Sequence, residues 1–483
     1  ESAANNKHLP ETFDPSNPST YISMLDCNNL YGFSMSEPLP VGDFKWLSAA
    51  EIRRLRIKNL GDDDEYGYVF VVDLLYPPHL HDKHNCYPLA DEHMLIEEEH
   101  LSDVSKNLLA GRRFKPVRKL VPNLYDKKEY VVHYRNLKLY LEEGLVIERI
   151  HSAIRFKQSR WLASYISKNT EYRKLAKSTF EKDFFKLLNN SLYGKLMQNL
   201  RKQCTVHFVS DVVAAEKQLC KHTCLRWTMI NDTFSTVQQR VHSIYWNRCT
   251  IIGLTVLQIS KLWMYRFHYR HMLPMYMTVK TRDCDGWPIY DSRLQLLFTD
   301  TDSFCYHIET DDLYSDLRSV VHLLDTSTYP LDHPLFSRVN EKKVGSFKDE
   351  TDSVPPLHFI GLRPKLYSLL VAKDVSKSKA KGVALRYTKK HLRHQQYVEC
   401  LHAGTVVTAS FKQIRSRDHQ LTTDTVQKVA LSSFYDKRWV LPDTQCTLAL
   451  GHWRITHSRH SNQPVVSPYD CTLCADLIRR RPR

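Results

Sequence analysis

Two short apolar segments on either side of an acidic turn constrain the fold most. Leu294, Leu296 and Phe298 alternate with polar or less apolar neighbours, the tetrapeptide D-T-D-S follows, and the apolar pattern resumes from Phe304 to Ile308. Alternation with a period of two on both sides of a tight turn predicts a strand and its returning antiparallel partner. The chain must therefore build a sheet around this hairpin and place two aspartates at its turn.

Other segments predict a mixture of strands and helices. Residues 21–25 (YISML) form a short apolar strand that delivers Asp26 at its end, and residues 359–372 form a strand pair around Pro364. Residues 171–200 lack proline and carry apolar side chains at helical spacing, so we expect one continuous helix in which Phe184, Leu187 and Leu188 pack inward. Asp311 and Asp312 open a further helix, with an apolar stripe from Leu313 through Leu317 and Val320 or Val321 to Leu324. This mixture predicts an α+β core with appendages.

The basic charge of the chain is concentrated near one end. Residues 361–483 contain 22 Lys and Arg but only 8 Asp and Glu, whereas the first 360 residues are almost neutral. Such a region fits a polyanionic partner, although a solvated surface would look the same. No segment approaches the ~20 apolar residues of a membrane span. Twelve scattered cysteines without a regular framework favour a reducing interior. We therefore expect an intracellular protein, in the nucleus or alternatively in a mitochondrion.

Asp26, Asp300 and Asp302 form the candidate catalytic and metal-binding set. A carboxylate at a strand end beside two more on a hairpin gives hard oxygen ligands suited to Mg²⁺. Two such ions could activate an attacking hydroxyl and stabilise a leaving pyrophosphate. In a regular strand, Asp300 and Asp302 would share a face. An isolated D-T-D is more often an ordinary turn, because both residue types favour turns.

Longer motifs favour the catalytic interpretation. DCNNLYG at 26–32, KLLNNSLYGK at 186–195 and FTDTDS at 298–303 occur in the order of motifs A, B and C of family B DNA polymerases, which they resemble. GLRPKLYS at 361–368 resembles the fourth, Lys-x-Tyr motif of that family. The most similar branch is the protein-primed one, and EKDFFKLLNNSLYGK, LFTDTDSFCYHIET and VGSFKDET look most like its Maverick/Polinton transposon members. The resemblance covers about residues 5–455.

This resemblance implies roles for the first motif. Asp26 and Asp302 would bind two Mg²⁺ ions, with Mn²⁺ as a substitute, and Asp300 would belong to the same acidic cluster. Cys27 would contribute only its backbone carbonyl. The ring of Tyr31 would pack under the incoming sugar and exclude a 2′-hydroxyl, although an isolated tyrosine would more often be part of a core.

The second motif would bind the incoming nucleotide. Lys186, Asn190 and Tyr193 fall at i, i+4 and i+7, within about 60° of one another on a helix. By resemblance the lysine would contact the triphosphate, the tyrosine would stack near the templating pair, and Gly194 would let that pair approach closely. Lys174 is a weaker candidate, since a continuous helix places it about 120° from Lys186.

The fourth motif and the basic region would hold DNA. Lys365 and Tyr367 are i and i+2, which places them on the same face of a strand, where they would hold the primer end near the metals. Lys379 and Lys381, with further basic side chains up to Arg393, would contact the duplex backbone, giving affinity without sequence information.

The predicted architecture is that of a right-hand polymerase with a palm of antiparallel sheet and helices, helical fingers, a basic thumb and two inserted lobes. The boundaries are residues 1–48 (palm start), 49–149 (lobe resembling a terminal-protein region), 150–200 (fingers), 201–255 (second lobe), 256–372 (palm), 373–456 (thumb) and 457–483 (basic, disordered tail). The first residues lack a starting methionine, which suggests a fragment. Because motif A begins at residue 26, which leaves no room before it for the exonuclease that family members normally carry, we expect a polymerase without proofreading.

The tail contains a second metal candidate. His457, His460, Cys471 and Cys474 could form a tetrahedral zinc site, although their order is not a common finger pattern. A disordered tail without metal is the alternative that we favour.

We therefore expect a DNA-directed DNA polymerase of a mobile or viral-type element, a monomer that uses dNTPs and a DNA primer-template, with a priming terminal protein as a further partner and no membrane. A catalytically impaired DNA-binding remnant of a transposon polymerase is the alternative. A reverse transcriptase is a second rival, but those enzymes usually carry adjacent aspartates, whereas this chain has D-T-D.

Overall fold

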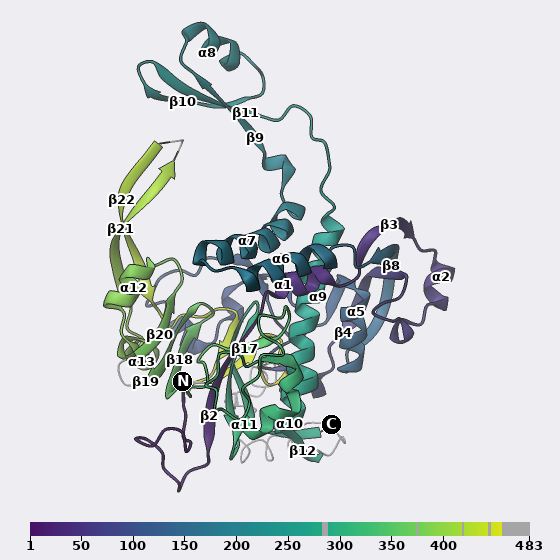
Figure 1. Cartoon of the computed structure of the whole chain (residues 1–483), viewed down its shortest axis with the longest axis vertical. Helices are drawn as coiled ribbons and strands as arrows, with labels where there is room; N and C mark the ends of the chain where they lie inside the picture. Colours follow the sequence, from purple (N-terminus) through teal and green to yellow (C-terminus); the bar gives the residue numbers. More distant parts are fainter. Residues whose placement is uncertain (283–287, 373–374, 418–419, 443–445, 456–483) are drawn as a thin grey trace.

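The computed structural model describes residues 1–282, 288–372, 375–417, 420–442 and 446–455. Figure 1 shows a main body, a small lobe that projects from it on two chain segments, and a long hairpin beside that lobe. His457, His460, Cys471 and Cys474, the zinc candidates, lie outside the described residues.

A five-stranded sheet in the main body carries the acidic turn. Its strands, in spatial order, are β14 (Leu294–Asp300), β15 (Ser303–Glu309), β2 (Thr20–Cys27), β17 (Phe347–Asp349) and β16 (Leu324–Asp325). All its pairs are antiparallel except β16 with β17. The predicted hairpin and the strand that delivers Asp26 are thus confirmed.

Both faces of this sheet are buried. Tyr21, Leu25 and Cys27 of β2 join the largest apolar core, whereas Ile22 and Met24 join a second core. This second core also contains residues of β18 and β19, and Asp26 has the same parity as Ile22 and Met24. Because side chains alternate between the faces of a strand, Asp26 points toward the side covered by β18 and β19.

A second sheet belongs to the first inserted region. Its strands are β3 (Leu39–Trp46), β8 (Val146–Ser159), β4 (Tyr66–Leu75) and β7 (Lys127–His133), all antiparallel, and α5 (Tyr134–Glu142) packs against it. The sheet spans residues 39–159, which is wider than the predicted 49–149. Its apolar side chains share the largest core with the five-stranded sheet, so this region is packed onto the main body.

Three helices cover the end of the main body where motifs A and B lie. They are α1 (Leu30–Ser36), α6 (Ala163–Leu175) and α7 (Thr179–Leu196), and all three contact one another. The continuous helix predicted over residues 171–200 is wrong. Ser178 caps α7 by accepting from Glu181 N–H, and the Glu181 carboxylate accepts from Ser178 N–H, so the chain breaks between α6 and α7.

The projecting lobe contains three strands and one helix. They are β9 (Cys204–Val209), α8 (Val212–Leu219), β10 (Cys224–Asn231) and β11 (Phe234–Arg240). Figure 1 shows that only the segments after α7 and before α9 (Thr250–Arg266) join this lobe to the main body.

The basic region forms a sheet with a long hairpin. The sheet has the order β1 (Ser2–Ala3), β18 (His358–Arg363), β19 (Leu366–Ala372) and β20 (Val375–Ala380). Helices α12 (Leu385–His391) and α13 (His394–Ala403) pack on it, and β21 (Val407–Arg417) pairs with β22 (Gln420–Leu431). The predicted strand pair around Pro364 is confirmed.

The remaining elements connect these parts. The strands are β5 (Glu92–Ile96), β6 (Val117–Val121), β12 (Met277–Arg282), β13 (Pro288–Ser292), β23 (Arg438–Val440) and β24 (Thr447–Ala449). The α-helices are α2 (Ala49–Arg54), α3 (His81–His84), α4 (Asp103–Asn107), α10 (Leu273–Tyr276) and α11 (Leu313–Asp316). A π-helix over Phe267–Met272 joins α9 to α10, and short 3₁₀ turns cover Ile57–Asn59, Pro78–Leu80, Glu98–His100, Leu200–Lys202 and Leu317–Leu323.

These elements confirm the predicted α+β class. The helix expected after Asp311 is shorter than predicted, because α11 ends at Asp316, a 3₁₀ turn follows, and Leu324 lies in β16. Asp312 does cap it, by accepting from the N–H groups of Tyr314 and Ser315. Within the described ranges, no helix is both long and apolar enough to cross a bilayer.

Candidate active site

Four side chains form a row across the five-stranded sheet. Asp300 pairs with Ser303, Ser303 pairs with Asp26, and Asp26 pairs with Lys348 on four successive strands. Directly paired residues of antiparallel strands project to the same face. The row therefore places the carboxylates of Asp26 and Asp300 on one face, two strands apart, with the Lys348 side chain on the other side of Asp26.

Asp302 joins this row through the hairpin turn. Its carbonyl accepts from Cys27 N–H at 2.7 Å, and its own N–H donates to the Asp300 carbonyl at 2.6 Å. The sequence predicted that Asp300 and Asp302 would share one face of a regular strand. This prediction is wrong, because the turn separates the two residues. The structure nevertheless brings Asp302 beside Asp26.

The backbone of this turn is strained at Thr301. Thr301 has φ 60°, a conformation that a β-branched residue rarely adopts. The hydrogen bond between Asp302 N–H and the Asp300 carbonyl closes a three-residue turn around it. Strained residues of this kind persist where the surrounding structure holds them, and they cluster at functional sites.

The electrostatics show that the carboxylates lie close together. Burial raises the pKa of Asp26 to about 7, and the charges of Asp302 and Glu350 act in the same direction, against Lys186 and Lys348. Burial likewise raises the pKa of Asp302, and the charge of Asp300 adds to it. Crowded, partly buried carboxylates are costly to ionise unless a cation neutralises them.

This donor set fits divalent cations such as Mg²⁺, which prefer carboxylate oxygens. Asp26 and Asp302 would hold the ions, which when bound lower the pKa of an attacking hydroxyl and neutralise charge on the leaving group. In the described part of the chain, no three carboxylate, imidazole or thiol groups converge into a finished metal site. The site in this structure is therefore a pair of adjacent carboxylates with others nearby. The Cys27 side chain is buried, so only its backbone could serve as a ligand.

Motif B faces the carboxylates from α7. The ammonium group of Lys186 lowers the pKa of both Asp26 and Asp302 against the larger effect of burial, which places this charge near both carboxylates. The rings of Tyr31 and Tyr193 stack at 4.5 Å and 11°. A basic group and a pair of stacked aromatic rings therefore lie near the acidic pair.

The other motif B residues are accessible. Asn190 is exposed, and a Cβ added to Gly194 would meet no atom within 4 Å. Packing within the chain therefore does not require a glycine at 194. Lys174 lies in α6, so the angular argument from one continuous helix does not apply to it. Phe184 and Leu187, which we expected to pack inward, are 46% and 62% exposed.

Replacing Gly194 by alanine separates stability from function. We expect the free energy of unfolding to rise by about 0.5–1 kcal/mol, because alanine favours an exposed helix and has room there. Primer extension should fall about 10–100-fold if a base pair approaches this surface, since small misplacements are costly. Urea unfolding and an extension assay measure the two effects. Unchanged extension would show that nothing approaches Gly194.

Lys365 forms an ion pair with Asp300. Its ammonium group lies 3.1 Å from Asp300 Oδ1. Lys365 occupies the turn between β18 and β19 with φ 64°, while Tyr367 is buried in β19 and stacks on Phe298 at 4.4 Å. The prediction that both share one strand face is therefore wrong.

The four candidate DNA contacts lie close together. Lys379 pairs with Tyr367 across the sheet, and Lys381 N–H donates to the Lys365 carbonyl.

Glu350 is a site residue that the sequence reasoning missed. Its charge contributes to the raised pKa of Asp26, and its N–H donates to the Met24 carbonyl at 2.8 Å. The motif VGSFKDET contains it, but no spacing in the sequence marked this carboxylate as a neighbour of Asp26.

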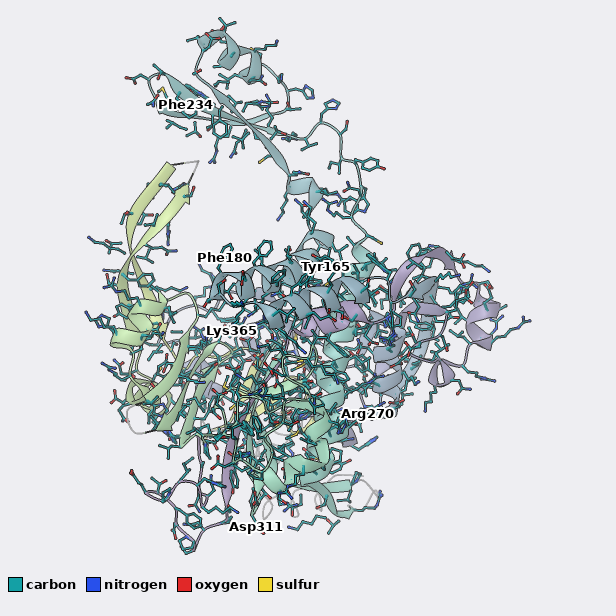
Figure 2. All side chains as sticks on the ribbon, in the orientation of Figure 1. Tyr165, Phe180, Phe234, Arg270, Asp311 and Lys365 are labelled. Carbon is teal, nitrogen blue, oxygen red and sulfur yellow. The ribbon has the colours of Figure 1, made fainter. Side chains whose placement is uncertain are left out.

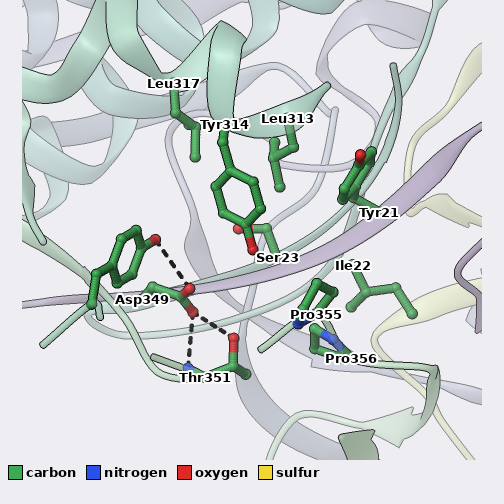
Figure 3. A pocket seen from close by; sticks show the side chains of 11 residues that line it. Tyr21, Ile22, Ser23, Leu313, Tyr314, Leu317, Asp349, Thr351, Pro355 and Pro356 are labelled. Atoms are coloured by element: carbon green, nitrogen blue, oxygen red, sulfur yellow. Dashed lines mark hydrogen bonds between the residues drawn. The ribbon is translucent and has the colours of Figure 1, made fainter. Parts of the chain in front are cut away.

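A small pocket on the other side of this segment explains how Glu350 is positioned (Figure 3). Asp349 is buried there. Its carboxylate accepts from Tyr329 O–H at 3.1 Å, from the hydroxyl and N–H of Thr351, and from Ser353 N–H. These bonds fix the segment that carries Lys348 and Glu350.

Asp349→Ala should destabilise the protein by about 2–4 kcal/mol, because it leaves several buried donors without an acceptor. Thermal unfolding measures the loss, and the exposed Asp332 provides a matched alanine control. Equal melting temperatures for the two variants would contradict the structural role of Asp349.

Residues 14–235 match the family model described as DNA polymerase type B, organellar and viral. This segment, which contains motifs A and B, is similar to that family. Asp300, Asp302 and Lys365 lie beyond it, so their placement in the site comes from the structure. No protein of curated function matches significantly.

Solved structures of Phi29 DNA polymerase show low similarity. An orthorhombic crystal form is 12% identical with a TM-score of 0.47, and the match covers 89% of this chain and 64% of that one. A ternary complex with primer-template DNA and incoming nucleotides is 14% identical with a TM-score of 0.48, covering 86% and 59%. The chain thus spans less than two thirds of these structures.

Proposed function

We propose that this chain is the polymerising part of a DNA-directed DNA polymerase that adds deoxynucleotides to a primer 3′ end. The observation that carries the proposal is the pairing that brings Asp26 of motif A beside Asp302 on the hairpin turn, with Lys186 near both. The match of residues 14–235 to the family model supports it.

Each group has a role under this proposal. Asp26 and Asp302 hold divalent cations, Mg²⁺ by preference, beside the primer end. Lys186 offers a positive charge to the triphosphate, and the Tyr31 ring, held against Tyr193, lies under the sugar. Lys365 and Tyr367, with Lys379 and Lys381, hold the primer strand. The five-stranded sheet then acts as the palm, α6 and α7 as fingers, and the basic region as the thumb.

The partners follow from these roles. A DNA primer-template and dNTPs are the proposed substrates. A solved structure of Phi29 DNA polymerase contains both primer-template DNA and incoming nucleotides. Priming by a protein hydroxyl, and a place in a mobile or viral-type element, remain part of the proposal through the motifs that resemble the protein-primed branch.

Primer extension by the purified chain tests the function. With Mg²⁺, dNTPs and a DNA template we expect extension by the wild type, and no extension by Asp302→Ala. Equal signals from both proteins would dismiss this site as the source of activity. An RNA template in parallel tests the reverse transcriptase alternative, and we expect little extension on it.

The competing candidate is a DNA-binding remnant without activity. The intact set of Asp26, Asp302, Lys186, Tyr31 and Lys365 favours the enzyme. A wild type that binds primer-template DNA but extends no primer under any divalent cation would favour the remnant.

A further inference from the structure

The row of side chains across the five-stranded sheet ends in a lysine to which the sequence motifs assigned no role. Lys348 of β17 pairs directly with Asp26 of β2, and the neighbouring Phe347 pairs with Cys27. Phe347 and Cys27 both belong to the largest apolar core. Because successive residues of a strand point to opposite faces, Lys348 and Asp26 project together on the face of the acidic cluster.

The charge of Lys348 acts on Asp26. Directly paired residues of antiparallel strands have Cβ atoms about 4.5–5.5 Å apart, which is within the reach of a lysine side chain. Burial is the largest cause of the raised pKa of Asp26, and the positive charge of Lys348 acts against it, as that of Lys186 does. Lys186 lies on α7, outside the sheet. Lys348 is therefore the cation that the five-stranded sheet itself presents to Asp26.

The ammonium group of Lys348 has a second carboxylate within reach. Its Nζ lies 3.4 Å from Asp352 Oδ1, and the side chains of Lys348 and Asp352 are 29% and 54% exposed. An ion pair with such an exposed partner contributes little to stability. Lys348 can thus exchange between two carboxylates, Asp26 in the acidic cluster and Asp352 in the turn that follows β17.

The turn that carries Asp352 is held by contacts other than Lys348. Asp352 and the residue after it both have positive φ, 52° and 68°, and the N–H of the second donates to the Asp349 carboxylate at 3.0 Å. Burial alone would raise the pKa of Asp352, but a hydrogen bond from Thr328 and the charges of Lys348 and Lys377 lower it. Since Lys377 also acts on Asp352, this carboxylate keeps a cation nearby when Lys348 turns to Asp26.

We propose that Lys348 is a built-in competitor of the divalent cation, whose ammonium group exchanges between Asp26 and Asp352 and must leave Asp26 before a cation can bind there. This inference rests on the proposed function, because it concerns the cation site at Asp26 and Asp302. Like charges repel, so Lys348 lowers the cation affinity of the empty site. A cation that arrives with a triphosphate brings the negative charge that offsets this repulsion.

Calorimetric titration of the full chain with Mn²⁺, without DNA or nucleotide, tests the inference. Lys348→Met should bind Mn²⁺ about tenfold more tightly than wild type, because a positive charge beside the ion is removed. Lys348→Arg keeps that charge and should bind within about threefold of wild type. Lys7→Met is the matched control, since Lys7 also forms an ion pair with an aspartate, Asp312 at 3.0 Å, and it should leave the affinity unchanged.

The direction of the effect separates competition from a structural role. Damage to the fold weakens cation binding, so a gain in affinity cannot result from it. The gain should disappear in Lys348→Met/Asp302→Asn, which places it at the acidic cluster. Unchanged or weaker Mn²⁺ binding by Lys348→Met would overturn the inference, and so would a gain that persists without the Asp302 carboxylate.

Asp352 tests the exchange. Asp352→Asn removes the alternative partner of the ammonium group, so Mn²⁺ binding should weaken by about threefold. Lys348→Met/Asp352→Asn should bind as Lys348→Met does, because no ammonium group is left to exchange. If Asp352→Asn weakened binding equally with and without Lys348, Asp352 would act on the ion directly, which would overturn the inference.

Primer extension distinguishes failure of this inference from failure of the proposed function. In an active enzyme, Lys348→Met should reach half-maximal extension at a lower Mg²⁺ concentration than wild type. Extension by wild type, without any gain in Mn²⁺ affinity in Lys348→Met, would keep the enzyme and dismiss the competition. The gain in affinity in a chain that extends no primer would do the reverse, and a wild type that binds no Mn²⁺ would dismiss both.

Discussion

Replacing Asp26 by asparagine should lower the kcat/KM of primer extension by about a thousandfold or more. The substitution keeps the shape of the side chain but removes the charge that would hold a divalent cation beside Asp302, and such a cation contributes several kcal/mol to stabilising the transition state. Single-nucleotide incorporation under excess Mg²⁺ measures the loss. Activity within tenfold of wild type would contradict the assignment of Asp26.

The same variant should make the metal-free protein more stable, and the gain should depend on pH. The pKa of Asp26 is raised by burial to about 7 in the folded state, so the folded protein binds the proton more tightly than the unfolded chain, whose aspartate has a pKa near 4. Stability of the wild type is therefore lost as pH rises from about 4 to 7. Asp26→Asn has no such loss, and the difference should approach about 4 kcal/mol near pH 8 at most.

Urea unfolding in a chelator across this pH range measures the difference. Asp311→Asn is the matched control, because Asp311 is exposed and Figure 2 shows it at the lower edge of the molecule, whereas Phe180 on α7 lies near mid-height. If the difference in the free energy of unfolding between wild type and Asp26→Asn stayed constant from pH 4 to 8, Asp26 would ionise as an ordinary aspartate does.

Replacing Tyr31 by valine should weaken discrimination between dNTPs and rNTPs by about tenfold to a few hundredfold. Tyr31 lies in α1 near Asp302, whose charge adds to burial in raising the pKa of the Tyr31 hydroxyl. Stacking on Tyr193 fixes the ring. A ring held there would block a 2′-hydroxyl by contact, and a smaller side chain would admit it. The ratio of kcat/KM values for dNTP and rNTP incorporation measures the change.

Tyr31→Phe is the control for this prediction, because it keeps the ring and should keep most of the discrimination. If valine and phenylalanine changed the ratio equally, the hydroxyl rather than the bulk of the ring would select the sugar. An unchanged ratio in both variants would place the nucleotide elsewhere.

The sequence predicted the elements that carry the acidic site because their signals are local. Alternating apolar residues around D-T-D-S predicted the hairpin, and YISML predicted the strand before Asp26. Their adjacency needed more than local pattern. Only the order of the motifs suggested that the hairpin and the strand before Asp26 lie side by side. In the structure, the pairing of Asp26 with Ser303 places them there.

Turn geometry limited the predictions about side-chain direction. The i and i+2 spacing implied that Lys365 and Tyr367 share one face of a strand. Lys365 instead lies in a turn with a positive φ, where the alternation of side chains along a strand does not apply. The break between α6 and α7 was detectable, since Ser178 and Glu181 have the spacing of a capping box. The exposure of Phe184 and Leu187 could not be predicted from the sequence. Helical periodicity shows which residues share a face, but it does not show what covers that face.

Glu350 illustrates a different limit. Its place beside Asp26 depends on β17 pairing with β2 across more than 300 residues of sequence, and on the hydrogen bonds of Asp349 that fix the segment. Long-range pairing of this kind leaves no periodic signal in one sequence.

Binding of Mn²⁺, measured by its electron paramagnetic resonance signal in titrations of the purified chain, tests the central claim most directly. A shared site predicts that Asp26→Asn and Asp302→Asn each weaken binding strongly, that the double variant is little worse than either, and that Asp311→Asn binds as wild type does. Wild-type affinity in both single variants would contradict a joint cation site at these two carboxylates.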